Sequence, residues 1–242
     1  MVNSDLWSRA LLAGAAALGL DIAAPTLARC RAHLDLLLLH NPRAGLTSLT
    51  DPVEIAIKHY LDSLSCLLLR DIAPDEEVAD LGSGAGFPGL VLAIARPGAS
   101  YTLVDASAKR TAFLRTAATA LGLADVEVVT ARAEDFSRRP DRRECYHLVL
   151  SRAVAPLPVL LEYCLPATRL HGHTLAMKGP EAEAELAAST HALALLGGRL
   201  AATRHLDLPQ HLGARTLLLF EKITPTPDRY PRRAGIPAKR PL

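Results

Sequence analysis

The sequence has few of the features that mark specialised classes of protein. Its four cysteines, Cys30, Cys66, Cys145 and Cys164, form no C-x-x-C pair, which favours free thiols in a reducing cytosol over a disulfide framework. The nine histidines do not combine with them into a convincing metal-ligand spacing, so we expect no metal site. The signal-like apolar run at residues 10–20 is too short to span a bilayer, and we interpret it as a packed helix.

The net charge is also small. The net charge of +2 is too small to indicate a nucleic-acid binder by itself, although local clusters of cations still matter. Half of the 242 residues are hydrophobic, which predicts a packed globular protein with one large domain or one domain and an appendage. We expect a cytoplasmic monomer with no membrane partner.

Three segments differ in their residue pattern. Residues 1–70 form a helical extension with apolar residues at helical spacing, interrupted by a breaker-rich loop at 41–52. In that loop Thr50 or Asp51 is predicted to cap the next helix, with Pro52 in its first turn. Residues 71–223 alternate short strands with helices, and residues 224–242 form a basic, proline-rich tail.

The alternating segment predicts an α/β fold with a mostly parallel, seven-stranded, doubly wound sheet. The short connection between the last two strands predicts an antiparallel hairpin. The predicted strands are 77–81, 100–105, 126–130, 146–151, 172–178, 200–207 and 214–221, and the predicted helices are 88–95, 108–121, 157–168 and 180–196.

A glycine-rich turn, D-L-G-S-G-A-G-F-P-G at residues 80–89, follows the first predicted strand. Such a turn before a helix lets a ligand approach the backbone, and Asp105 at the end of the next strand suits a ribose diol. The turn also matches the dinucleotide pattern, and a turn without a ligand is the plainer alternative. Asp80 favours S-adenosylmethionine, because it would repel a pyrophosphate and attract a methionine ammonium.

Ligands of this fold class bind at the carboxyl ends of the strands. Ala133 and Glu134 would border the adenine there, although Glu134 has the alternative role of a helix-capping acid. The residues predicted to contact the cofactor are Gly82, Phe87, Asp105, Ala106, Ser107, Ala133, Glu134 and Arg152.

The end of the fourth predicted strand bears on the substrate. Its sequence, S-R-A-V-A-P at 151–156, lacks the Asn/Asp-Pro-Pro-aromatic motif that holds exocyclic amines, and no cysteine is well placed for attack on cytosine C5. A ring nitrogen such as guanine N7 needs neither a base nor a covalent nucleophile, so we assign no catalytic residue. Arg152 and Lys178 suit guanine O6 or phosphate, or else form ordinary ion pairs.

As a set, these motifs resemble the RsmG (GidB) family of bacterial 16S rRNA guanine-N7 methyltransferases. The resemblance includes K-H-Y-L-D-S at 58–63, D-A-S-A-K-R at 105–110, A-R-A-E at 131–134 and Lys178-Gly179. It implies a Rossmann-like class I methyltransferase fold, the cofactor contacts given above, and guanine 527 of 16S rRNA in the small ribosomal subunit as the target. Gly45 stands where the family usually has asparagine, which puts that side chain's hydrogen bond in doubt.

The tail resembles the ending of many family members and has two interpretations. It is either a solvated end, extended or disordered alone, or a strap in which Arg232 and Arg233 contact RNA phosphates. Two other functions stay open: a methyltransferase for another substrate, and an S-adenosylmethionine-binding ribosome-assembly factor without turnover.

Overall fold

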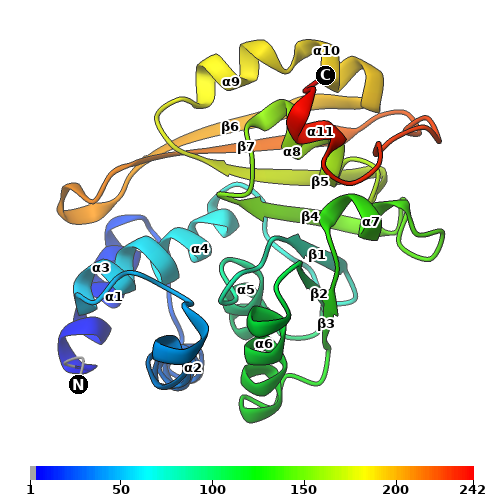
Figure 1. Cartoon of the computed structure of the whole chain (residues 1–242). Coiled ribbons are helices and arrows are strands. Elements are labelled where there is room, and N and C mark those ends of the chain that lie inside the picture. Colours follow the sequence, from blue (N-terminus) through cyan, green and yellow to red (C-terminus); the bar gives the residue numbers. More distant parts are fainter. Residues whose placement is uncertain (1–3) are drawn as a thin grey trace.

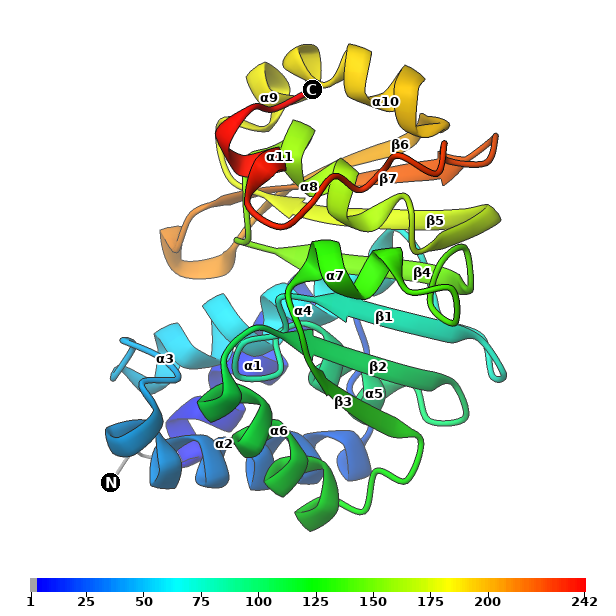
Figure 2. The same cartoon turned by 45° about the vertical axis from the view of Figure 1, so that its right-hand side comes forward.

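A seven-stranded sheet with helices on both faces organises the protein (Figures 1 and 2). The computed structural model describes residues 4–242. The strand order is β3-β2-β1-β4-β5-β7-β6. The strands are β1 (Glu77–Leu81), β2 (Ser100–Asp105), β3 (Val126–Thr130), β4 (Tyr146–Arg152), β5 (Thr168–Lys178), β6 (Gly198–Asp207) and β7 (Ala214–Lys222).

The pairing confirms the predicted α/β class. Strands β1 to β5 pair in parallel, and β7 lies between β5 and β6, antiparallel to both. The expected hairpin is therefore β6–β7. The predicted strands match the observed ones closely, and the main difference is that β5 begins four residues early, at Thr168.

Alternating side chains of the strands supply a core on each face of the sheet. On one face Val78 packs with Leu148 against the helix α5 (Gly89–Ala95), and Leu103 of β2 packs against α5 and α6 (Ala108–Ala120). On the other face Ala79 and Leu81 pack with Phe136. The helices there are α7 (Ala133–Arg138), α8 (Leu157–Cys164), α9 (Ala182–Ala188) and α10 (Thr190–Leu196).

The N-terminal helices cover the first of these faces (Figure 1). Trp7 and Leu11 of the first helix are fully buried, and the Trp7 ring meets the Tyr60 ring edge-on at 4.9 Å. The expected packing of the apolar run 10–20 is thus confirmed. The elements are α1 (Ser4–Ala17), α2 (Ala24–Ala44), α3 (Pro52–Ile55), the π-helix η1 (Ala56–Leu61), α4 (Asp62–Leu64) and the 3-10 helix η2 (Ser65–Leu68).

The loop after α2 is shorter than predicted, because the helix continues through Pro42 to Ala44. It ends at Gly45, whose φ of 59° lies in the left-handed region that glycine and asparagine tolerate best. Gly45 therefore preserves the helix end. The Asn41 side chain accepts hydrogen bonds from the N–H groups of Leu46 and Thr47. Asp51 caps α3 as predicted, accepting from the Glu54 N–H.

Three predictions near the C-terminus were wrong. The predicted helix 157–168 ends at Cys164 because β5 begins at Thr168, and the predicted helix 180–196 is divided at Ser189. The tail is neither extended nor disordered: it packs along α7 and α8 and contains α11 (Ile236–Lys239) (Figure 2). A composition rich in proline and cations does not reveal the buried carboxylates that hold it.

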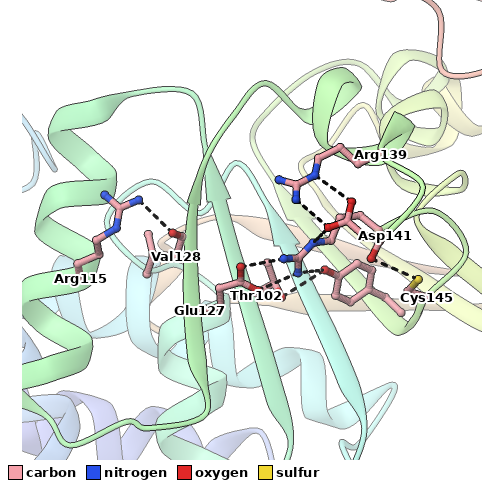
Figure 3. A network of polar contacts seen from close by, with 9 residues as sticks. Thr102, Arg115, Glu127, Val128, Arg139, Asp141 and Cys145 are labelled. Carbon is pink, nitrogen blue, oxygen red and sulfur yellow. Dashed lines mark hydrogen bonds and ion pairs between the residues drawn. The ribbon is translucent and has the colours of Figure 1, made fainter.

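The arginines of segment 138–143 form hydrogen bonds and ion pairs with other residues of the protein. Arg142 forms two 2.8 Å bonds to the Glu127 carboxylate of β3 and one to the Tyr146 hydroxyl, and Arg139 pairs with Asp141 (Figure 3). Arg115 donates to the carbonyl of Val128. Since β3 is an edge strand, these charged side chains cover an edge that would otherwise invite pairing.

Candidate cofactor and substrate site

A cavity of about 380 Å³ opens where β1 and β2 end. Six of the eight predicted cofactor residues line it: Gly82, Asp105, Ala106, Ala133, Glu134 and Arg152. Two residues of the tail, Gly235 and Ala238, also line it. The other two predicted residues do not line it: Ser107 donates its N–H to Asp105, and Phe87 is a buried residue of the glycine turn whose ring stacks on His59.

Asp105 is fixed at the mouth of this cavity by the backbone. One carboxylate oxygen accepts the Gly84 N–H at 3.0 Å, and the other accepts the Ser107 N–H at 2.8 Å. A carboxylate has about four acceptor positions, so two remain for hydroxyl groups. The side chain is almost buried, which keeps water from competing for them. This is a suitable acceptor for a ribose diol.

Asp80 lies beneath the glycine turn with one oxygen unpaired. Its Oδ2 accepts the Gly89 N–H at 2.9 Å, whereas Oδ1 is buried and has no hydrogen-bond partner among residues 4–242. Burial raises the pKa of Asp80 to about 6, while the Gly89 N–H opposes that rise. A buried carboxylate with a missing partner suits a cationic group such as an ammonium.

Gly82 lines the cavity and packs closely against Val154, which lines it too. Its φ of 85° lies in the left-handed region, and a Cβ added there would lie 2.3 Å from Cγ2 of Val154. Side chains larger than glycine would therefore crowd the cavity that Gly82 lines. The open acceptor positions of Asp105 at the cavity, and the unpaired oxygen of Asp80 buried beside the glycine turn, fit the ribose and the ammonium of S-adenosylmethionine.

A second cavity, of about 690 Å³, adjoins the first. It is lined by residues of the loop 45–49, the segment 58–62, and the ends of β4, β5 and β7. Arg152 lines both cavities, and its guanidinium carbon lies 5.4 Å from the centroid of the Phe87 ring. The site thus has two compartments that share two arginines, Arg152 and Arg110.

Asp62 holds that arginine in place. Its buried carboxylate accepts from Nη1 of Arg152 at 2.9 Å and from Nε of Arg215 at 3.1 Å. The same Nη1 of Arg152 donates to the Lys58 carbonyl at 2.9 Å. Charge-assisted bonds of this kind are the strong ones, so Asp62 joins the helical extension to β4 and β7.

His59 lines the larger cavity and contacts the glycine turn through Phe87. Its ring stacks on Phe87 at 4.5 Å, and Nε2 lies 2.8 Å from the Thr47 hydroxyl. Burial, and then the positive charge of Arg152, lower the pKa of His59 to about 4, which keeps the imidazole neutral.

Comparison of the sequence with known proteins shows which family the chain belongs to. The sequence profile described as rRNA small subunit methyltransferase G matches residues 26–212. The chain is 47% identical over 234 residues to the ribosomal RNA small subunit methyltransferase G of Symbiobacterium thermophilum, covering 95% of each chain. The chain belongs to the rRNA small subunit methyltransferase G family. It is therefore a member of a methyltransferase family, as the motifs predicted.

Solved structures of similar shape are methyltransferases or related proteins of low sequence identity. TrmN from Thermus thermophilus is 22% identical with a TM-score of 0.52, covering 75% of this chain and 52% of that one. M. jannaschii TYW2 in complex with AdoMet is 14% identical with a TM-score of 0.50, covering 63% of this chain and 72% of that one. These likenesses confirm the Rossmann-like methyltransferase fold.

Sequence reasoning gave no role to three residues of this site. Asp62 and His59 belong to the K-H-Y-L-D-S run, which signalled the family but not the contacts. Arg215 carried no signal, because it is a single arginine on a hairpin strand, 153 residues from the carboxylate it binds.

The predicted substrate residues lie in different settings. Lys178 pairs with Glu185 at 2.6 Å and also lines the larger cavity. The guanidinium of Arg232 binds the fully buried Glu162, whereas Arg233 is exposed. The RNA contacts of Lys178, Arg232 and Arg233 stay predictions.

Metal-binding clusters and membrane-spanning helices are both missing from the described part of the chain. Between residues 4 and 242, no three histidine, cysteine or acidic side chains gather closely enough to hold a metal ion. Over the same range, no helix has both the length and the apolar character needed to cross a membrane.

The helical extension supports the glycine turn through His33. Its Nε2 lies 3.1 Å from the Ala85 carbonyl oxygen, and because a carbonyl can only accept, Nε2 must carry the proton and donate. In the neutral ring Nδ1 is then unprotonated and accepts from the Tyr60 hydroxyl at 3.0 Å. The ring is fully buried. Burial lowers its pKa to about 4, while the bond to Ala85 opposes that change.

The burial of His33 predicts acid sensitivity. Between pH 6.5 and about 4 the histidine of the unfolded chain binds a proton and the folded one does not. The free energy of unfolding should therefore decrease as the pH is lowered through this range, by up to about 3 kcal/mol. Asp80 acts oppositely, since its raised pKa makes the folded state bind the extra proton. The free energies of unfolding in urea of wild type and His33→Gln, each measured at pH 7 and pH 5, isolate the contribution of His33 to the pH dependence. Equal pH dependence in both proteins would contradict a neutral, buried His33.

Proposed function

We propose that the protein transfers the methyl group of S-adenosylmethionine to N7 of a guanine in 16S rRNA, guanine 527 by resemblance. The observation that carries the proposal is the pair of adjoining cavities that share Arg152. The smaller one has an acceptor suited to a ribose, with the unpaired oxygen of Asp80 buried beside the adjacent glycine turn, and the larger one has room for a nucleotide. Membership of the rRNA methyltransferase family supports an RNA in the second cavity.

In this proposal the smaller cavity holds the cofactor by both ends. Asp105 accepts from the ribose hydroxyls, and Oδ1 of Asp80 takes the methionine ammonium as the partner it lacks. Ala133 and Glu134 border the adenine. The bound donor would supply an electrophilic methyl group, which guanine N7 takes with its lone pair while the sulfur leaves as a neutral thioether.

No general base is needed, because N7 carries no proton. The residues of the site have to orient the base and exclude water. Guanine presents O6 beside N7 on one edge, so a cation that donates to O6 aligns N7 without covering it. Arg152 is suited to this role, because Asp62 and the Lys58 carbonyl hold Nη1, while within residues 4–242 Nε and Nη2 have no protein partner. Lys178, at the rim of the larger cavity, suits O6 or a phosphate.

A labelling experiment tests the proposal. Wild-type protein with methyl-labelled S-adenosylmethionine is expected to label 16S rRNA from small subunits that lack the modification, at a single guanine located by mass mapping. RNA transcribed with 7-deazaguanosine, which has no N7 lone pair, should remain unlabelled. Label in the deaza transcript would exclude N7 as the acceptor. Donor binding without label in any small-subunit substrate would favour the assembly-factor alternative.

A further inference from the structure

The C-terminal tail contributes to the smaller cavity. Gly235 and Ala238 line that cavity together with Gly82 and Asp105. The Gly235 N–H donates at 2.8 Å to Oε1 of Glu134, whose side chain is buried and lines the same cavity. A segment that the sequence marks as a solvated end therefore touches a residue expected to border the adenine.

An anchor of unusual strength lies three residues earlier in the tail. Arg232 contributes three donors to the fully buried carboxylate of Glu162: Nε at 2.9 Å, Nη2 at 2.6 Å and its own backbone N–H at 2.8 Å. A buried carboxylate without its partner is strongly unfavourable, so Arg232 has little freedom to leave. Only two residues separate it from Gly235, and the anchor thus fixes where the Gly235 N–H lies.

Other contacts hold the start of the tail. Arg143 donates to the carbonyls of Thr226 and Tyr230, and Arg138 donates to the carbonyl of Pro231. These bonds use backbone carbonyls, so they hold the chain whatever its side chains are. Glu162 differs, because it binds one particular side chain next to the cavity.

We propose that the tail is part of the cofactor site, and that Arg232 and Glu162 are positioning residues for Glu134. This inference rests on the proposed function, in that the adenine lies in the smaller cavity. The Gly235 N–H engages one oxygen of Glu134, which orients the other to accept from the amino group of adenine. Loss of the anchor lets the carboxylate turn, and discrimination between adenine and a base with a carbonyl in that position declines.

The test compares two ligands on the full chain by calorimetry, S-adenosylhomocysteine and S-inosylhomocysteine, which differ in that amino group. Wild type should prefer the adenosyl ligand by about tenfold or more, the effect of one charged hydrogen bond. Arg232→Gln should lose most of this preference, whereas Arg233→Gln, the same charge change at an exposed neighbour, should retain it.

A second pair of variants covers the case in which Arg232→Gln does not fold. Gly235→Ala strains a residue with φ of 80° and open space around its Cβ, which displaces the N–H. Gly122→Ala applies similar strain at φ of 65°, also in open space, at a residue that does not line the smaller cavity. Only the Gly235 variant should lose the preference for the adenosyl ligand.

The outcomes separate this inference from the proposed function. If folded Arg232→Gln and Gly235→Ala discriminate like wild type, the positioning role is wrong and the cofactor assignment stands. An equal loss of affinity for both ligands would also overturn it, since that indicates a merely structural tail. If wild type binds neither ligand, the proposed cofactor fails and this inference fails with it.

Discussion

Replacing Asp105 with alanine is expected to weaken the binding of S-adenosylmethionine by about 100-fold or more. Two hydrogen bonds from ribose hydroxyls to a carboxylate are lost, each contributing about 1.5 kcal/mol or more. The Gly84 and Ser107 N–H groups lose their acceptor as well, so the turn around the ligand is less ordered. Calorimetric titration of the donor into the purified variant measures the effect.

Two further variants control this experiment. Asp105→Asn keeps the shape of the side chain and one acceptor oxygen, and its affinity should lie between those of wild type and the alanine variant. Asp125→Ala removes the same charge from an exposed position before β3 and should bind the donor normally. An unchanged dissociation constant for Asp105→Ala would remove the ribose from this end of the cavity.

Replacing Asp62 with alanine should reduce methyl transfer to rRNA by about 100-fold. The carboxylate holds Arg152 and Arg215 at once, so its loss releases both cations and leaves Arg152 without a fixed direction. Misplacement of an orienting group by about 1 Å is enough for such an effect. The unfolding free energy should also fall, by about 2–4 kcal/mol, because charged hydrogen bonds at a buried site are lost.

The rate at saturating donor separates this role from donor binding. Asp62→Ala should lower that rate while changing the dissociation constant of S-adenosylmethionine far less, since Asp62 lines the larger cavity and not the smaller one. Glu54→Ala, the control, removes a partly exposed ion pair with Lys58. It should lower the free energy of unfolding by less than about 1 kcal/mol. A full rate in Asp62→Ala would show that Arg152 needs no such support.

The helical extension gains a physical role from these contacts. Asp62 binds the arginines of β4 and β7, His59 stacks on Phe87, and His33 supports the glycine turn through the Ala85 carbonyl. Asp62 and His59 line the larger cavity, and the glycine turn that His33 supports contributes Gly82 to the smaller one. The extension is therefore built into the site.

Local patterns were sufficient for most of the fold. Apolar runs bounded by glycine, proline and acids located all seven strands, since a buried strand needs a continuous apolar stretch and a turn at each end. Helix ends were harder to predict. The helix from Leu157 ends at Cys164 without a strong capping signal in the sequence, and the six-residue helix α7 was not predicted at all.

The sequence by itself determined the sheet, the glycine turn and the acids at the strand ends, because these depend on backbone geometry and on neighbours close in the chain. Only the tertiary structure decided which long side chains meet. Arg215 reaches Asp62 across 153 residues, Arg232 reaches Glu162 across 70, and Gly235 reaches Glu134 across 101. A flexible cationic side chain can pair with any carboxylate within reach, so its partner is decided by how the elements pack. Such a pairing has no characteristic residue spacing by which the sequence could reveal it.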